Sequence, residues 1–209
     1  MAIQADNIDD YIVELEARLD KSDTCANTHY NLGVAYLSKR RMEDAKMYFL
    51  RAIERSQNLA EAYVQLGGIA MHEGDLEACL RYNSAASQAR ARFAVPYGNM
   101  GFCHLQLGNV EEAIKMLRKA IKMDNQFVQA YGTLASALFM AGELDESIEM
   151  SKKAVELHPK FGPAWNNLAL AYLEKGDAKQ AMNFVKQAQE CNFEVHPGLI
   201  ADIEAKLGA

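Results

Sequence analysis

The sequence predicts an all-α fold, a right-handed superhelical solenoid of tandem helix-turn-helix units. The chain resembles itself five times at a period of 34 residues, large and small side chains recur at fixed places in each copy, and single glycines divide most copies in two. One unit of this kind cannot bury its own apolar face, so neighbouring units stack and leave an extended concave surface. The column that defines the register is Gly33, Gly67, Gly101, Ala135 and Ala169.

Other columns keep the same chemistry in every copy. A large ring lies four residues before the small column, at His29, Tyr63, Tyr97, Tyr131 and Trp165. Leu32, Leu66, Met100, Leu134 and Leu168 come directly before it, and Ala52, Ala86, Ala120, Ala154 and Ala188 follow in the second half. Small residues let two helices approach closely while the larger ones fill the space beside them. Gly74, Gly108, Gly142 and Gly176 are expected to end the first helix of a copy, with Arg40 as the exception.

The first expected element is an amphipathic helix within residues 1–25. Its apolar residues fall on one helical face and are separated by acidic ones. They are Ile8, Tyr11, Ile12, Leu15 and Leu19. We expect this helix to cover the open end of the first repeat. The alternative is that it docks into the groove of another copy and drives self-assembly.

Five repeats follow at 26–59, 60–93, 94–127, 128–161 and 162–195, together spanning 26–195. The second repeat is the weakest, because Asn83 stands at a position that is usually apolar or aromatic. A one-residue deletion before Leu76 gives an alternative alignment there. After the repeats, Pro197 is expected to begin a C-terminal capping helix within 196–209, in which Ile200, Ile203 and Leu207 share a face.

The columns resemble the tetratricopeptide repeat, whose motif runs aromatic, two residues, Leu-Gly, two residues, Tyr, then alanine, aromatic, alanine and proline. The clearest match is the fifth copy, with Trp165, Leu168, Ala169, Tyr172, Gly176, Ala181 and Ala188. The resemblance implies a protein-protein interaction module or adaptor whose first helices line a concave peptide-binding groove.

Composition narrows the function classes. The formal net charge is -6, which argues against nucleic acid, because binding a phosphate backbone requires clustered Lys and Arg. No apolar run approaches the length of a membrane span. The N-terminus lacks the basic start and apolar run of a secretory signal, so we expect a cytoplasmic protein.

No catalytic or metal-binding pattern is present, and no cofactor is expected. Cys25, Cys79, Cys103 and Cys191 form no CxxC pair and are interpreted as small core residues in a reducing compartment. His104 adjoins Cys103, but zinc sites normally show paired ligands at short spacing. The remaining histidines are scattered, and no phosphate-binding loop or nucleophile motif occurs. We therefore expect no enzyme activity.

The resemblance places the groove residues beside the leucine and small columns. In some family members an asparagine ladder grips extended peptide backbones, because an amide side chain both donates and accepts. The matching polar column here is Asn31, Gln65, Asn99, Thr133 and Asn167, with the ladder carried over by identity at the three asparagines. A neighbouring column adds Val34, Phe102, Ser136 and Leu170 as candidates for an apolar floor.

The partner is therefore expected to be a protein or peptide with an uncharged or apolar segment, extended or helical. Family members that bind the acidic tails of heat-shock chaperones use a Lys- and Arg-containing clamp. The equivalent positions of this chain hold no cation in any of three registers, so that function is not expected. The alternatives are a self-assembling scaffold that uses the N-terminal helix, or a regulatory subunit of a larger complex.

Overall fold

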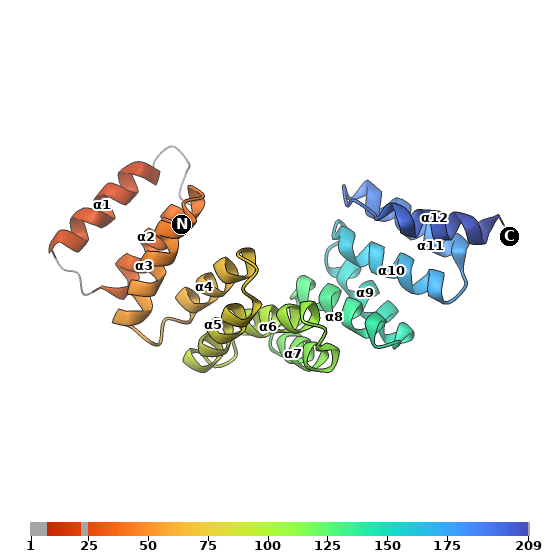
Figure 1. Ribbon diagram of the computed structural model, residues 1–209, viewed down its shortest axis with the longest axis horizontal. Helices are drawn as coiled ribbons and strands as arrows, with labels where there is room; N and C mark the ends of the chain where they lie inside the picture. The colour runs from red at the N-terminus through yellow and green to blue at the C-terminus, as the bar shows by residue number, and fades with distance from the viewer. Residues whose placement is uncertain (1–7, 22–24, 209) are drawn as a thin grey trace. The chain divides into compact units, whose positions relative to one another are not determined.

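The computed structural model describes residues 8–21 and 25–208, which are helical and contain no β-strand. Contacts divide the chain into two compact units, one ending at Asn99 and one beginning at Met100, and each is considered separately below. The helices, shown in Figure 1, are α1 (Ile8–Lys21), α2 (Ala26–Ser38), α3 (Met42–Arg55), α4 (Ala60–His72), α5 (Leu76–Ala89), α6 (Ala94–Gln106), α7 (Val110–Met123), α8 (Val128–Met140), α9 (Leu144–Leu157), α10 (Gly162–Glu174), α11 (Ala178–Glu190) and α12 (Pro197–Leu207).

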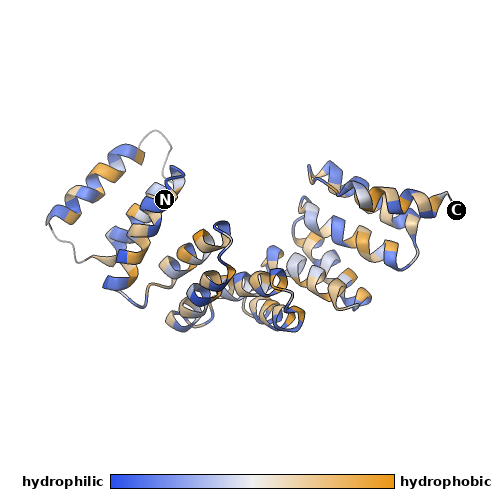
Figure 2. Cartoon of the chain, viewed as in Figure 1, coloured by the Kyte–Doolittle hydropathy of each residue, from blue (hydrophilic) through white to orange (hydrophobic). Residues whose placement is uncertain are grey.

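The helices between α1 and α12 form five pairs, in which α2, α4, α6, α8 and α10 are called the A helices and their successors the B helices. The A helices begin at 26, 60, 94, 128 and 162, which keeps the 34-residue period. Polar and apolar stretches alternate along the helices, as Figure 2 shows. The four turn glycines have φ between 78° and 83°, the left-handed conformation that ends an A helix. Arg40 adopts the same conformation at φ 58°.

Within a pair, the two helices meet where a small A-helix residue faces a residue sixteen positions later on the B helix. A β-carbon placed at Gly33 would lie 2.6 Å from the ring of Phe49, and one at Gly101 would lie 2.5 Å from Cγ of Leu117. In the last pair the small residue is Ala169, and the residue sixteen positions on is Val185 in the same buried cluster. Small and large volumes are therefore matched across the pairs.

The second pair keeps the uninterrupted register, so the alternative with a deletion before Leu76 is wrong. Asn83 is fully buried on α5 and faces Gly67, in the place that Phe49 occupies in the first pair. Its Nδ2 donates to the carbonyl oxygen of Cys79 at 2.9 Å, while its Oδ1 accepts a hydrogen bond from Asn99 at 3.0 Å. Because both ends of the amide are bonded, the core tolerates this polar residue.

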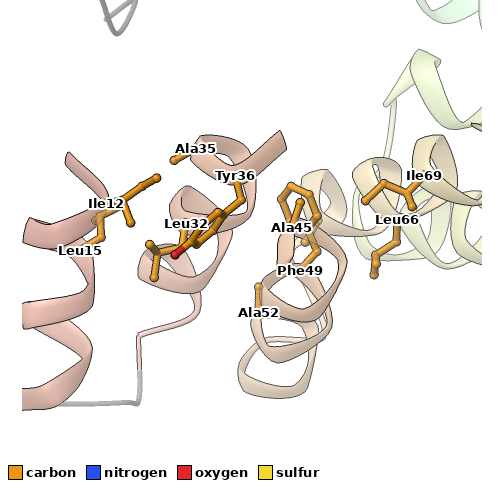
Figure 3. Close-up of a cluster of buried hydrophobic side chains, with 11 residues drawn as sticks. Ile12, Leu15, Leu32, Ala35, Tyr36, Ala45, Phe49, Ala52, Leu66 and Ile69 are labelled. Atoms are coloured by element: carbon orange, nitrogen blue, oxygen red, sulfur yellow. The ribbon is translucent and has the colours of Figure 1, made fainter. Parts of the chain in front are cut away.

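In unit 1, α1 packs against α2 within the same chain. Its Ile12 and Leu15 are buried in a cluster with Leu32, Phe49 and Leu66, as Figure 3 shows. The hydroxyl of Tyr36 donates to Glu16 on α1 at 2.7 Å, and burial together with this bond raises the pKa of Tyr36 to about 12. The amphipathic face expected for this helix is thus the face that contacts the first repeat.

In unit 2, α12 closes the cluster formed by α10 and α11. Ile203 is fully buried and Leu199 is 7% exposed, while Ile200 packs partly against them. The expected face of this helix is therefore correct at Ile203 but not at Leu207, which is 44% exposed. Leu199, near the start of the helix, is buried instead.

Candidate functional site

Charge is segregated between the two kinds of helix. The A helices contain no Lys or Arg, and their only acidic residues are Glu61 on α4 and Glu174 at the end of α10. Each B helix, in contrast, carries both acidic and basic side chains. Any surface formed by A helices is therefore nearly free of charge, and a segment bound there gains little from ion pairing.

Such a surface is hollowed in unit 2, where a trough of about 690 Å³ follows α8. The side chains on α8 that line it are spaced 129, 132, 133, 136 and 140, which is one stripe along a helix. The C-terminal half of α6 and the start of α10 form the walls. The trough is lined by Phe102, Leu105, Gln106, Gln129, Gly132, Thr133, Ser136, Met140, Phe161 and Pro163.

Small residues on α8 create this depression. Gly132 has no side chain, and a β-carbon there would lie 2.6 Å from the ring of Phe161, so the ring lies close against the helix. Thr133 and Ser136 are short, whereas Phe102 and Met140 are long. Met140 is 58% exposed, an unusually open position for a large apolar side chain. None of the lining side chains is ionisable.

The polar groups beneath the trough are hydrogen-bonded to one another. Asn167 on α10 is 8% exposed, and its Nδ2 donates to the carbonyl oxygen of Gly132 at 2.9 Å and to Oγ of Ser136 at 3.0 Å. The hydroxyl of Thr133 donates to the carbonyl oxygen of Gln129 at 2.9 Å. Asn167 therefore links α10 to α8 below the surface that a ligand can touch.

The expected groove residues of unit 2 thus have different places. Phe102, Thr133 and Ser136 line the trough. Asn167 lies under it, and Leu170 packs partly against the cluster of α10 to α12. The sequence columns did not single out Gln106, Gln129, Met140 and Phe161, which lie toward or beyond the ends of helices, away from the central columns.

The expected groove residues of unit 1 are all partly exposed. Val34 packs against the core cluster, and the amide of Asn31 has no hydrogen-bond partner within the described residues. Burial raises the pKa of Tyr30, and a hydrogen bond with the Gln65 side chain opposes this rise. Asn99 donates to Asn83 and keeps its own oxygen as an acceptor.

A second hollow, of about 640 Å³, lies between α1 and α3 in unit 1. Its lining mixes both signs of charge, with Glu16, Asp20 and Glu54 beside Arg51 and Arg55. It differs from the trough along α8, whose lining contains no ionisable side chain.

None of the four cysteines forms a disulfide, and two of them fit the expected core role. Cys79 and Cys103 are fully buried. Cys191 is half-buried, and Cys25 is exposed at the N-cap of α2, which corrects the expectation of a core residue there. A hydrogen bond from the Thr28 side chain lowers the pKa of the Cys25 thiol. Among the described residues, no three His, Cys, Asp or Glu side chains gather as a metal site would require.

The chain consists of stacked helix pairs whose turn residues adopt the left-handed backbone conformation, and one surface has an uncharged hollow. This arrangement defines a helical-repeat protein. Tetratricopeptide repeat profiles match residues 26–59, 104–150 and 138–203, which together make up more than half of the chain. The chain belongs to the tetratricopeptide repeat family, whose members are generally protein-interaction modules.

Solved structures show the same fold. The chain is 16% identical to pilF of Pseudomonas aeruginosa, with a TM-score of 0.79 over 97% of this chain and 90% of that one. It is 18% identical to YrrB, described as a TPR protein with an unusual peptide-binding site, with a TM-score of 0.72 over 92% and 97% of the two chains. It is 24% identical to MamA, with a TM-score of 0.67 over 77% and 94%. Comparison with curated protein sequences finds no significant match.

Within the described ranges, no helix combines the length and the apolar character needed to cross a membrane.

Proposed function

We propose that this protein is a non-catalytic binding module that holds an uncharged segment of a partner protein in the trough along α8. The observation that carries the proposal is the trough itself, a hollow of about 690 Å³ whose lining includes Phe102, Leu105 and Met140 and no ionisable side chain. Exposed apolar surface that is concave and rimmed by polar groups is typical of a protein docking site.

The chemistry of the lining selects the partner. Burying an unpaired charge against Phe102, Leu105 and Met140 is costly, so acidic tails and nucleic-acid phosphates are poor occupants. An apolar side chain gains about 25 cal/mol for each Å² that it removes from water. The partner we propose therefore has an uncharged or apolar segment, and it requires no cofactor.

Cys79 and Cys103 are buried and form no disulfide, which supports a reducing compartment. We propose the cytoplasm as the place of action.

The test is capture of partners from native cell extract with three proteins: wild type, Met140→Glu and Leu107→Glu. Met140 lies in the trough, whereas Leu107 is a matched control that is 44% exposed and outside the lining. Partners bound in the trough should be lost from Met140→Glu and kept by Leu107→Glu. Their retention should change little between ~50 mM and ~500 mM salt, because no ion pair is screened.

Two results would contradict the proposal. One is the same set of partners captured by wild type and Met140→Glu. The other is a set released by salt, which would indicate that charged B helices make the contact. Recovery of only further copies of this chain would support self-assembly instead.

A further inference from the structure

The side-chain amides of Gln106 and Gln129 line the trough along α8 and are not hydrogen-bonded within the described residues. The inference drawn from them rests on the proposed function. We infer that the trough holds a partner segment in extended conformation, about five residues long and parallel to α8, and that Gln129 and Gln106 bind its main chain. Asn167, the residue most similar to the family's peptide-gripping asparagines, makes no contact with that main chain.

The length of the segment follows from the geometry of the trough. Its stripe on α8 runs from Gln129 to Met140, and eleven steps at 1.5 Å per residue make ~16 Å. An extended chain advances ~3.3 Å per residue, so ~5 residues fill this length. A longer segment continues past both ends of the trough.

The two amides are positioned to bind opposite ends of such a segment. Gln129 is near the start of α8, and Gln106 is the last residue of α6. Successive helices joined by short turns run antiparallel, so α6 and α8, with one helix between them, share a direction. Gln129 therefore lies at the end of the trough where α8 begins, and Gln106 lies toward the end where α8 finishes.

Both amides are available. Gln106 and Gln129 are exposed, and neither side chain has a hydrogen-bond partner within the described residues. Each carries a donor and an acceptor, which matches the carbonyl and N–H groups of one peptide unit. The lining also contains apolar side chains that can contact side chains of the segment: Phe102, Leu105 and Phe161, with Met140 at the end where α8 finishes.

The other polar residues of the trough are already committed. The hydroxyl of Thr133 donates to the carbonyl oxygen of Gln129 at 2.9 Å, so toward a ligand it can only accept. The Nδ2 of Asn167 is bonded to Gly132 and Ser136, and its Oδ1 lies 3.2 Å from the Ser136 hydroxyl that donates to it. At 8% exposure, Asn167 positions the floor and does not reach its occupant.

An extended segment uses these groups better than a helix does. The main-chain groups of a bound helix are already paired with one another, so the two amides would remain unpaired beside it. An extended segment leaves its N–H and carbonyl groups free, and alternate side chains point into the apolar floor and toward solvent.

The experiment uses a phage-displayed library of random linear twelve-residue peptides selected on the full-length protein. Enriched peptides are synthesised, and their affinities are measured for wild type, Met140→Glu, Gln129→Ala, Gln106→Ala and Asn167→Ala. Gln189→Ala is the control, because Gln189 is exposed on α11 and outside the trough. Thermal unfolding of each variant verifies that it is folded.

A second series replaces single backbone N–H groups of an enriched peptide by N-methyl groups. We expect enriched peptides to share an uncharged core of about five residues and each glutamine variant to weaken binding about three- to tenfold. N-methylation at one peptide position should weaken binding to wild type and to Asn167→Ala alike, and have no further effect on Gln129→Ala.

The outcomes separate this inference from the proposed function. Peptides that lose affinity for Met140→Glu but not for either glutamine variant leave the proposed function standing and overturn the inference. A bound peptide that is helical by NMR, or an N-methyl effect that disappears in Asn167→Ala, also overturns it. No enrichment, or enriched peptides that bind Met140→Glu normally, overturns both.

Discussion

Enlarging Gly101 while shortening Leu117 should test whether side-chain volumes are matched where the two helices of a pair touch. A β-carbon at Gly101 lies 2.5 Å from Cγ of Leu117 and 3.3 Å from the backbone oxygen of Ala113, so Gly101→Ala overpacks the contact. Overpacking costs about 1–3 kcal/mol, and the gain in helix propensity returns about 1 kcal/mol. We expect a net loss of about 1 kcal/mol.

Leu117→Val alone removes one methylene from a fully buried site and should cost about 1 kcal/mol. The double variant recreates the combination that the last pair has at Ala169 and Val185. The smaller valine leaves room for the new methyl group, so the double variant should lie within about 0.5 kcal/mol of wild type. The coupling energy is then about 1.5 kcal/mol, within the range for residues in contact.

The assay is urea unfolding of the four proteins, followed by far-UV circular dichroism and compared at equal m-values. If the two single losses simply add in the double variant, within about 0.5 kcal/mol, the volume-matching argument is refuted.

Three further predictions follow from single contacts. Ser151→Ala should raise the free energy of unfolding by about 1 kcal/mol, because the buried Oγ has no hydrogen-bond partner among the described residues; an unchanged or lower urea midpoint would contradict this. Arg40→Gly should stabilise by about 0.5–1 kcal/mol, since φ is 58° there; a loss of thermal stability would count against it. A hydrogen bond of 2.5 Å from Nζ of Lys175 lowers the pKa of Asp145 from its ordinary value, so the ion pair contributes to stability at neutral pH and its contribution is lost as pH falls through the lowered pKa. Lys175→Met should raise the NMR titration midpoint of Asp145, and an unmoved midpoint would refute the assignment.

The fold was predictable because the repeat period fixes both the helix starts and the buried columns. The left-handed turn glycines and the buried alanines recur at constant spacing, and even the polar Asn83 stays in register. The sequence did not predict which side chains of the last helix are buried. The sequence predicts Leu207 on one face of the capping helix with Ile200 and Ile203, but Leu207 is exposed in the structure and Leu199 is buried beside Ile203.

The candidate site was less predictable, because it depends on whether each asparagine side chain is exposed or hydrogen-bonded inside the protein. Asn99 and Asn167 occupy the same sequence column, yet Asn99 is partly exposed and Asn167 is buried. The difference arises on α8, where Gly132 and Ser136 offer an oxygen each to the Asn167 amide. Gln129 lies outside the repeat columns, which follow the helix centres, whereas the trough extends along the whole of α8.

If the trough binds a partner as proposed, the segregation of charge between A and B helices separates the control of the association rate constant from that of the dissociation rate constant. Long-range fields from the B helices and from the net charge of -6 influence how often a charged partner protein arrives. In the proposed binding mode, short-range contacts on the nearly uncharged A helices would determine how long a bound segment stays. Substitutions of charged residues on the B helices should therefore alter the association rate and its salt dependence. Substitutions in the trough should alter the residence time of a bound segment.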